Sequence, residues 1–432
     1  MMTHRIASWM TVLAIACGSC VGNAGPTNSS EDMKRVAEGN NRFALQLYQK
    51  LQSAEGNLFL SPYSISTALA MTYAGARGET REQMARVLSL ATSTEAAQMS
   101  SAAGGSAPTT PPTGKPMTQE QVAQAFGKII KDLNARGAGG KYELRVANAL
   151  WGQRDYRFLP EFVTLVEREY GGHLEQADFV KAAEQARQTI NTWVEKQTNG
   201  KIRDLIGPGV LDAMTRLVLT NAIYFKGNWI NQFEKDQTQD GPFTLADATK
   251  VQVPMMNQQA RFGYAETDTL QALEMPYAGE GLAMVILLPK KMDGIAALGQ
   301  ELTADNLVQW LGQIHQRQVI VSVPKFKMTS KFSLAQVLQS MGMVEAFSDK
   351  ADFSGMAGNR ELFLSAVIHQ AYVDVNEEGT EAAAATGAVI SATSVGPDQT
   401  PVFRADHPFL FLIRDIKSGS VLFLGRVMNP TT

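Results

Sequence analysis

Cysteine is almost missing from this chain of 432 residues, which holds 2 cysteines, Cys17 and Cys20, both near its start. If the first residues are removed on export, no disulfide can form, and burial of a core has to stabilise the fold. Histidine is also scarce, with 5 residues, and we find no His-Glu-x-x-His, Cys-x-x-Cys, Gly-x-Ser-x-Gly or phosphate-binding glycine pattern. We therefore predict that the protein is not an enzyme, binds no metal and needs no cofactor.

Charge of one sign is not concentrated anywhere along the chain. The 39 Lys and Arg residues are scattered and nearly balanced by 42 Asp and Glu residues, which leaves a formal net charge of -3. Without a basic run that could follow a phosphate backbone, nucleic acid is not an expected partner. Hydrophobic residues make up 44% of the chain, which is enough to bury a large core.

The N-terminus carries Arg5 and then the apolar run Ile6–Ala16, which is too short to span a bilayer and is typical of an export signal. Two processing sites compete. Cleavage after Gly22-Asn23-Ala24 would remove residues 1–24 as a signal peptide, whereas Ala14-Ile15-Ala16-Cys17 resembles a bacterial lipobox, with residues 1–16 removed and Cys17 lipidated. The sequence thus predicts a secreted, extracellular or periplasmic protein, or one attached to the outer membrane through its lipid.

Helical patterns come early in the chain and strand patterns come late, which predicts an α+β fold. We expect residues 25–35 to be flexible and residues 36–432 to form a single domain, with a flexible insertion at 91–117 that is rich in Ala, Ser, Thr, Gly and Pro. Helices are expected over 40–51, after the Ser61 N-cap and its Pro62, and from a capping box at Thr80. Strands are expected over 217–225, 283–288, 319–323, 362–375 and 421–427.

One segment gives conflicting local signals. Residues 376–386 contain Glu and an alanine run that favour a helix, Val389 and Ile390 favour a strand, and Gly396-Pro397 with Pro401 favours an exposed loop. From these residues alone, an alanine-rich surface helix with a tail is as good an interpretation as an extended, exposed segment.

Several long motifs in the same order resemble the serpin family, from about Asn40 to the C-terminus. Residues 57–66, Asn-Leu-Phe-Leu-Ser-Pro-Tyr-Ser-Ile-Ser, and 71–78 resemble the serpin helix B region. Residues 220–227, Thr-Asn-Ala-Ile-Tyr-Phe-Lys-Gly, resemble the third strand of the large serpin sheet A. Residues 406–411 and 423–430 resemble the C-terminal strands. The resemblance implies the serpin fold, in which helices pack around a large central mixed sheet A with two smaller sheets and an exposed reactive-centre loop, here residues 377–403.

The resemblance also implies a mechanism, in which a protease cleaves the loop and is trapped as an acyl-enzyme while the hinge inserts as a strand into sheet A. Counting along the loop as in serpins places the bait bond between Thr393 and Ser394, within a few residues. The small hinge residues would pass easily between two strands. The hinge comprises Glu377, Glu378, Gly379, Thr380, Glu381, Ala382, Ala383, Ala384 and Ala385.

Two further groups follow from the resemblance. Ser61, Ser64, Asn221 and His369 correspond to the shutter, a hydrogen-bonded cluster that reorganises when the sheet opens, although a satisfied core histidine is the simpler alternative. Trp229, Lys325 and Glu377 correspond to the breach, where the loop first enters, with an ion pair expected between Lys325 and Glu377.

No Lys or Arg occurs between Glu381 and Arg404, so trypsin-like proteases are poor targets. Elastase-like or subtilisin-like serine proteases are the expected partners, papain-like cysteine proteases are a further candidate, and the protein is expected to be a monomer. The second hypothesis is a non-inhibitory serpin that acts as a carrier, chaperone or binding protein. An enzyme whose catalytic residues come from distant positions is the third.

Overall fold

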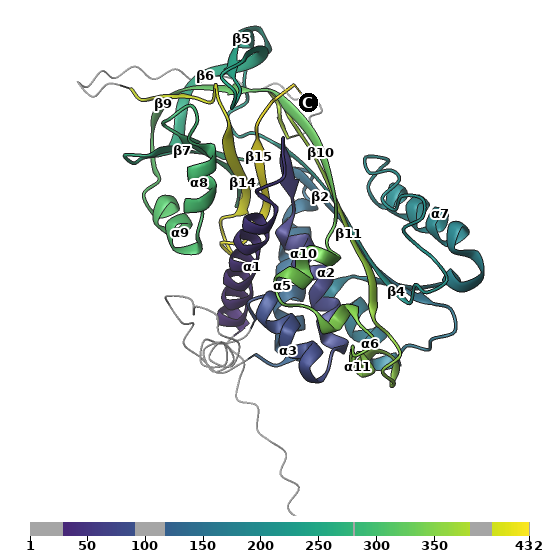
Figure 1. Cartoon of the computed structure of the whole chain (residues 1–432). Helices are drawn as coiled ribbons and strands as arrows, with labels where there is room; N and C mark the ends of the chain where they lie inside the picture. Colours follow the sequence, from purple (N-terminus) through teal and green to yellow (C-terminus); the bar gives the residue numbers. More distant parts are fainter. Residues whose placement is uncertain (1–28, 91–116, 280, 381–399, 432) are drawn as a thin grey trace, which may run out of the picture.

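The computed structural model describes residues 29–90, 117–279, 281–380 and 400–431. Two sheets with helices packed around them make up this part of the chain (Figure 1). The predicted export signal with Cys17, nearly all of the insertion, the hinge from Glu381 onward and the bait bond lie outside the described residues. The helices are α1 Ser29–Leu51, α2 Pro62–Gly75, α3 Gly78–Val87, α5 Gln119–Gly137, α6 Pro160–Leu165, α7 Phe179–Gln197, α8 Ile295–Glu301, α9 Ala304–Gly312, α10 Ala335–Ser340 and α11 Ser354–Ala357.

The strands fall into a six-stranded sheet, which corresponds to the expected sheet A, and a nine-stranded second sheet. Sheet A has the order β10-β11-β12-β4-β2-β3, with β10 Phe326–Ser333, β11 Leu364–Val375, β12 Gly379–Thr380, β4 Leu217–Asn228, β2 Tyr142–Gln153 and β3 His173–Ala177. The second sheet contains β1 Leu58–Leu60, β5 Gln239–Thr244, β6 Lys250–Glu266, β7 Leu270–Pro276, β8 Leu282–Pro289, β9 His315–Pro324, β13 Val402–Arg404, β14 Phe409–Asp415 and β15 Val421–Val427.

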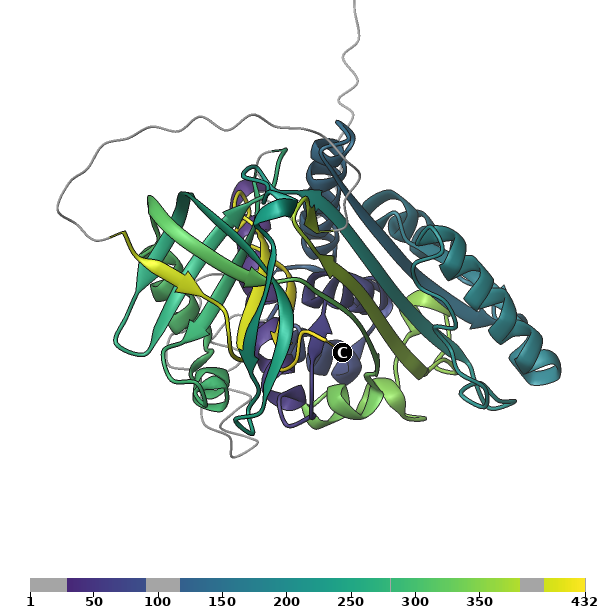
Figure 2. The same ribbon diagram turned by 90° about the horizontal axis from the view of Figure 1, so that it is seen from above.

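Sheet A is mixed and is covered on both faces. The β11–β4 and β2–β3 pairs are parallel, and the other pairs in this sheet are antiparallel. Along β4, Val218, Ala222 and Tyr224 pack with α7, whereas Leu219 and Ile223 join the large core that contains α2. This alternation is what a two-residue side-chain repeat produces in a strand buried on both faces. Figures 1 and 2 show α7 lying along the outer face of β2, β4 and β11.

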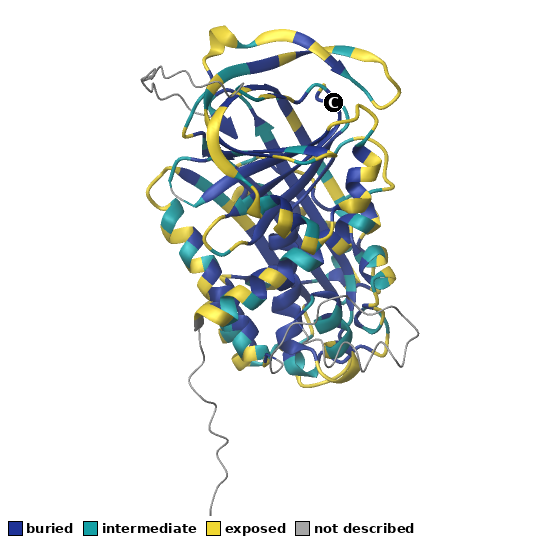
Figure 3. Cartoon of the chain, turned by 90° about the vertical axis from the view of Figure 1, so that its left-hand side faces the viewer, coloured by how far each residue is buried: buried dark blue, intermediate teal, exposed yellow. Residues whose placement is uncertain are grey.

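The two smaller sheets predicted beside sheet A are joined into one. Strand β6 is 17 residues long and pairs with β5 and β9 over most of its length and with β7 at its end. Because one strand takes part in both groups of pairings, the hydrogen bonds run without a break from β1 to β13. Figure 3 shows the buried residues along these central strands and the exposed ones on the outer faces of helices and loops.

Two local predictions were wrong. Helix α1 begins at Ser29, inside the segment predicted to be flexible, because Met33 and the buried Val36 extend the apolar stripe of this helix toward its start. Thr80 does not cap α3, which begins at Gly78. The buried hydroxyl of Thr80 instead accepts a hydrogen bond from the Asp352 N–H at 2.9 Å. The hydroxyl that the local pattern predicted to cap the helix therefore makes a tertiary contact.

The start of α2 follows the sequence prediction. Ser61 is the N-cap, its hydroxyl accepts from the Ser64 N–H at 3.1 Å, and Pro62 occupies the first helical position. Within the described residues, no helix is long and apolar enough to cross a membrane.

Candidate functional site

The two central strands of sheet A part at one end. β11 and β4 pair directly from Leu364 with Leu217 to Tyr372 with Tyr224, and we call this paired stretch the seam. Beyond the seam the chain after β11 turns back, and β12 lies between the two strands and pairs antiparallel with both. Thr380 lies opposite Val375 on β11 and Gly227 on β4. Sheet A therefore already accepts two residues of the hinge as a strand.

This arrangement corrects both ends of the loop predicted over residues 377–403. Glu377, Gly379 and Thr380 are buried rather than exposed, and Val402 and Phe403 belong to strand β13, which pairs with β9. Threonine favours strands and glycine disfavours them, so a strand of only these two residues leaves no recognisable pattern in the sequence. The gap between β11 and β4 that accepts them is a tertiary feature.

Gly379 lies where another residue would not fit. Its φ is +156°, and a Cβ atom at this position would lie 2.0 Å from the Gly227 carbonyl oxygen and 2.6 Å from the Asn228 Cα. Both contacts are with the backbone of β4, which cannot give way as a flexible side chain could. Glycine at position 379 is thus a requirement for β12 to pair with β4.

We expect Gly379→Ala to displace β12 from sheet A. Trp229 reports on this change, because its Nε1–H donates to the Asn376 carbonyl at 3.0 Å and its backbone N–H to the Glu378 carbonyl at 2.9 Å. The tryptophan emission should shift to longer wavelength as the indole loses these contacts. Gly342→Ala is the matched control, because Gly342 also has a positive φ but open space around its Cβ position. An unchanged spectrum for Gly379→Ala would contradict the prediction.

Thr380 fills a small buried space. Its exposed fraction is 0%, and its hydroxyl hydrogen-bonds the Tyr277 hydroxyl at 2.7 Å. Tyr277 stacks on Trp229 with ring centroids 4.5 Å apart and packs edge-on against Phe225, and burial raises the pKa of Tyr277 above its ordinary value. The site accepts a short side chain with a single hydroxyl and has no room for a solvated charge.

The predicted ion pair at the breach is present. Lys325 Nζ lies 2.9 Å from Glu377 Oε2, and the Thr238 hydroxyl donates to Glu377 Oε1 at 2.9 Å. Burial of the Glu377 carboxyl opposes its ionisation, but the contacts with Lys325 and Thr238 outweigh it and hold the pKa of Glu377 below its usual value. On the solvent side, Lys235 pairs with Glu378 at 2.5 Å. Sequence reasoning missed Thr238, Lys235 and Tyr277, because none belongs to a local motif.

The predicted shutter residues also come together. His369 on β11 and Asn221 on β4 are direct partners across the seam, and His369 Nδ1 hydrogen-bonds Asn221 Oδ1. Asn221 Nδ2 donates to Ser64 Oγ at 2.5 Å. Ser61 donates its backbone N–H to His369 Nε2 at 3.1 Å and its hydroxyl to the Leu422 carbonyl at 2.6 Å. Separation of β4 from β11 has to break the bond between His369 and Asn221.

Asn148 on β2 is a member of this cluster that sequence reasoning missed. Its Oδ1 accepts hydrogen bonds from Asn221 Nδ2 and, at 3.3 Å, from Ser64 Oγ. The one available signal was its position: a polar side chain in a strand that is otherwise apolar from Ala147 to Trp151. The cluster therefore ties α2 to three strands of sheet A and to β15.

His369 is neutral in this cluster. Because Nε2 accepts a hydrogen bond from the Ser61 N–H, the single ring proton is on Nδ1, and Nδ1–H donates a hydrogen bond to Asn221 Oδ1. Complete burial lowers the pKa of His369 to about 3. Among the described residues, no group of three or more His, Cys, Asp or Glu side chains could hold a metal ion.

The fold and the site together define a loop-inserting protein, whose central sheet opens at one end to take in a strand from the chain's own loop. The chain belongs to the serpin family: residues 38–430 match the family described as Serpin (serine protease inhibitor). The leukocyte elastase inhibitor of Homo sapiens is 41% identical over 409 residues, which cover 92% of this chain and 100% of that protein.

Solved structures agree with the family assignment. Uncleaved ovalbumin superposes with a TM-score of 0.76 at 32% identity, covering 91% of this chain and 100% of that one. Human thyroxine-binding globulin gives a TM-score of 0.79 at 29% identity, covering 93% of this chain and 100% of that one. The serpin fold predicted from the sequence is confirmed.

Proposed function

We propose that this serpin inhibits elastase-like serine proteases by a suicide mechanism. The protease attacks the bait loop near Thr393-Ser394, and the serine oxygen of the enzyme forms an ester with the Thr393 carbonyl while the peptide starting at Ser394 leaves. The hinge then continues the path of β12 between β4 and β11, which carries the enzyme to the other end of sheet A before water can hydrolyse the ester.

The observation that carries this proposal is the position of β12. Thr380 is already paired with both strands, and Gly379 with β4, just beyond the last direct pair of β4 and β11. Insertion can therefore extend an existing strand rather than start a new one. The similarity to the leukocyte elastase inhibitor of Homo sapiens supports the choice of enzyme. The bait loop agrees, because it offers Ala, Thr, Ser and Val and no cation.

The test is to mix the full chain with elastase-like, subtilisin-like, trypsin-like and papain-like proteases and to analyse the products on denaturing gels and by mass spectrometry. We expect a denaturation-resistant complex with the elastase-like enzyme, together with a released peptide that begins at Ser394. Subtilisin-like and papain-like enzymes are further candidates, and the trypsin-like enzyme should form no complex. Cleavage near Thr393 without a complex from any enzyme would favour the non-inhibitory hypothesis of a carrier, chaperone or binding protein.

We also propose that the protein is exported by a bacterium and acts outside the cytoplasm. This rests on residues 1–24 alone, with lipidation at Cys17 as the alternative to cleavage after Ala24. Mass measurement of the mature N-terminus separates the two, because lipidation adds acyl chains to Cys17 and simple cleavage removes that residue.

A further inference from the structure

Lys201 contacts both strands of the seam at the end nearest β12. The last direct pair of the seam is Tyr372 on β11 and Tyr224 on β4, and their ring centroids are 6.2 Å apart. Lys201 Nζ is 6.0 Å from the centroid of the Tyr224 ring and 5.7 Å from that of the Tyr372 ring. Both distances suit a cation–π interaction, so one ammonium group is attracted to a ring on each side of the seam.

The turn that carries Lys201 is firmly held. It follows α7, and the Lys201 N–H donates to the Thr198 carbonyl at 2.9 Å. The next residue, Ile202, is buried in the core beneath α7, and its N–H donates to the Thr198 hydroxyl at 3.2 Å. Lys331 Nζ on β10 donates to the Asp204 carbonyl of the same turn at 2.9 Å. Because none of these contacts uses the Lys201 side chain, a substitution there leaves the turn in place.

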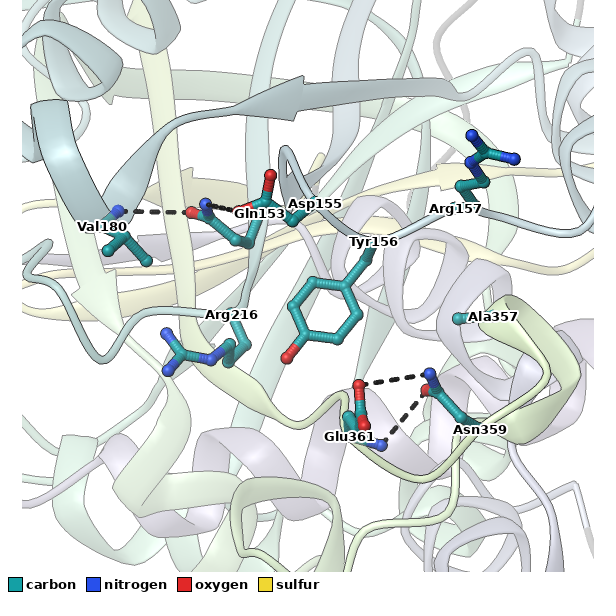
Figure 4. A pocket seen from close by; sticks show the side chains of 9 residues that line it. All are labelled: Gln153, Asp155, Tyr156, Arg157, Val180, Arg216, Ala357, Asn359 and Glu361. Carbon is teal, nitrogen blue, oxygen red and sulfur yellow. Dashed lines mark hydrogen bonds between the residues drawn. The ribbon is translucent and has the colours of Figure 1, made fainter.

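The other end of the seam is different. A polar hollow of about 530 Å³ lies beside the start of β4, bordered by Arg216 on the β4 side and Glu361 on the β11 side (Figure 4). The Glu361 carboxylate accepts a hydrogen bond from Asn359 at 3.2 Å, and the Arg216 guanidinium donates to the Ala213 carbonyl at 2.9 Å. These two side chains bond within their own segments, so they do not join the two sides of the seam as Lys201 does.

Insertion of the hinge has to separate the two tyrosines. The pairing of Thr380 with both strands places position 383 opposite both rings. Partners on adjacent strands point to the same face of a sheet, so Ala383 would lie between Tyr224 and Tyr372. A new strand moves its neighbours about 4.8 Å further apart. With the alanine between the rings, the Lys201 ammonium can keep its contact with only one of them.

We propose that Lys201 acts as a clasp on the seam, meaning one cation that contacts both strands and slows the first step of insertion. The inference deepens the proposed function, because it names a residue that controls the rate at which sheet A opens. The clasp stabilises the closed seam and has no counterpart in the inserted sheet, so it raises the barrier to insertion. It thereby protects the uncleaved protein from taking in its own loop too early.

The experiment measures how fast the full-length chain takes up a fluorescein-labelled synthetic peptide with the sequence of residues 381–393, followed by anisotropy. Uptake of this peptide requires the seam to open but needs no protease. Lys201→Met keeps most of the side chain and removes the charge. It should raise the uptake rate about threefold, which is the effect of one exposed cation–π contact on a barrier. Lys201→Arg keeps a cation near the rings and should restore the slow rate.

Lys327→Met is the matched control. Lys327 Nζ is 5.5 Å from the centroid of the same Tyr372 ring, but Lys327 comes from β10, which pairs with β11 and lies on one side of the seam. Its removal weakens a contact with that ring without parting the two strands. We therefore expect Lys327→Met to take up the peptide at the rate of the unmodified chain.

The outcomes separate this inference from the inhibitory function. An unchanged uptake rate for Lys201→Met would overturn the clasp and leave the inhibitory function standing. A slower rate would also overturn it, because the cation would then attract the incoming hinge, whose Glu381 has the opposite charge. If the unmodified chain took up no peptide, the clasp would not limit opening and the inference would fail. Formation of the protease complex by the same preparation would then decide on the inhibitory function.

Discussion

Thr380→Arg is expected to abolish covalent trapping, so that the protease cleaves the protein and leaves unharmed. Thr380 is completely buried between β11 and β4, and its hydroxyl bonds Tyr277. An arginine would have to place a cation in this apolar gap, at a cost of several kcal/mol. The hinge would stay outside the sheet, insertion would become slower than ester hydrolysis, and the enzyme would be released.

The measurement is the number of inhibitor molecules cleaved for each enzyme molecule inhibited. We expect this ratio to rise at least tenfold for Thr380→Arg, with the complex band missing from denaturing gels. Thr380→Ser keeps both the size and the hydroxyl and should behave like the unmodified chain, whereas Thr380→Val tests the hydroxyl alone. If Thr380→Arg formed complexes at the normal ratio, insertion through this gap could not be the trapping step.

Acid is expected to destabilise the protein through His369. Burial lowers the pKa of His369 to about 3 in the native state, whereas an unfolded chain has the ordinary value near 6.5. Between these two pH values the unfolded chain binds a proton that the native chain does not, so the free energy of unfolding falls as the pH falls from 6.5 toward 3. His369 makes its full contribution to the free energy of unfolding above pH 6.5. Between pH 7 and pH 5 we expect the free energy of unfolding to fall by about 2 kcal/mol through this residue.

Urea unfolding at pH 7 and pH 5 tests this dependence. His369→Gln should be less stable than the unmodified chain at pH 7, because the substitution disturbs the cluster. Its free energy of unfolding should, however, change much less between pH 7 and pH 5 than that of the unmodified chain. In the unmodified chain, NMR signals of the His369 ring should not titrate between pH 7 and pH 5. A histidine that titrates with an ordinary pKa in the folded protein would disprove the assignment.

Much of the site was predictable, because its members lie in long motifs whose order is informative. The strands predicted over 217–225 and 362–375 correspond to β4 and β11. The ion pair predicted between Lys325 and Glu377 is present. Their apolar and β-branched residues match a sheet that is buried on both faces.

The missed features depend on contacts between distant segments. Nothing local marks Tyr277 as the partner of Thr380, Asn148 as a partner of Asn221, or Ser365 as the acceptor for the Arg216 N–H. The pairing of Gly379 and Thr380 depends on the shape of a gap between two strands, to which the sequence of the hinge contributes only small size. Single-sequence patterns describe a segment's preferences, and tertiary contacts decide among them.

The seam between β4 and β11 gives the insertion a direction. Each parallel pair that separates is replaced by two antiparallel pairings, one with each strand, so the hydrogen bonds that are lost are more than restored. Withdrawal of the inserted strand would lose these hydrogen bonds, and the cleaved loop cannot be rejoined. In the proposed mechanism each molecule therefore inhibits one enzyme molecule and is not regenerated, so the amount of protein made limits the amount of enzyme inhibited.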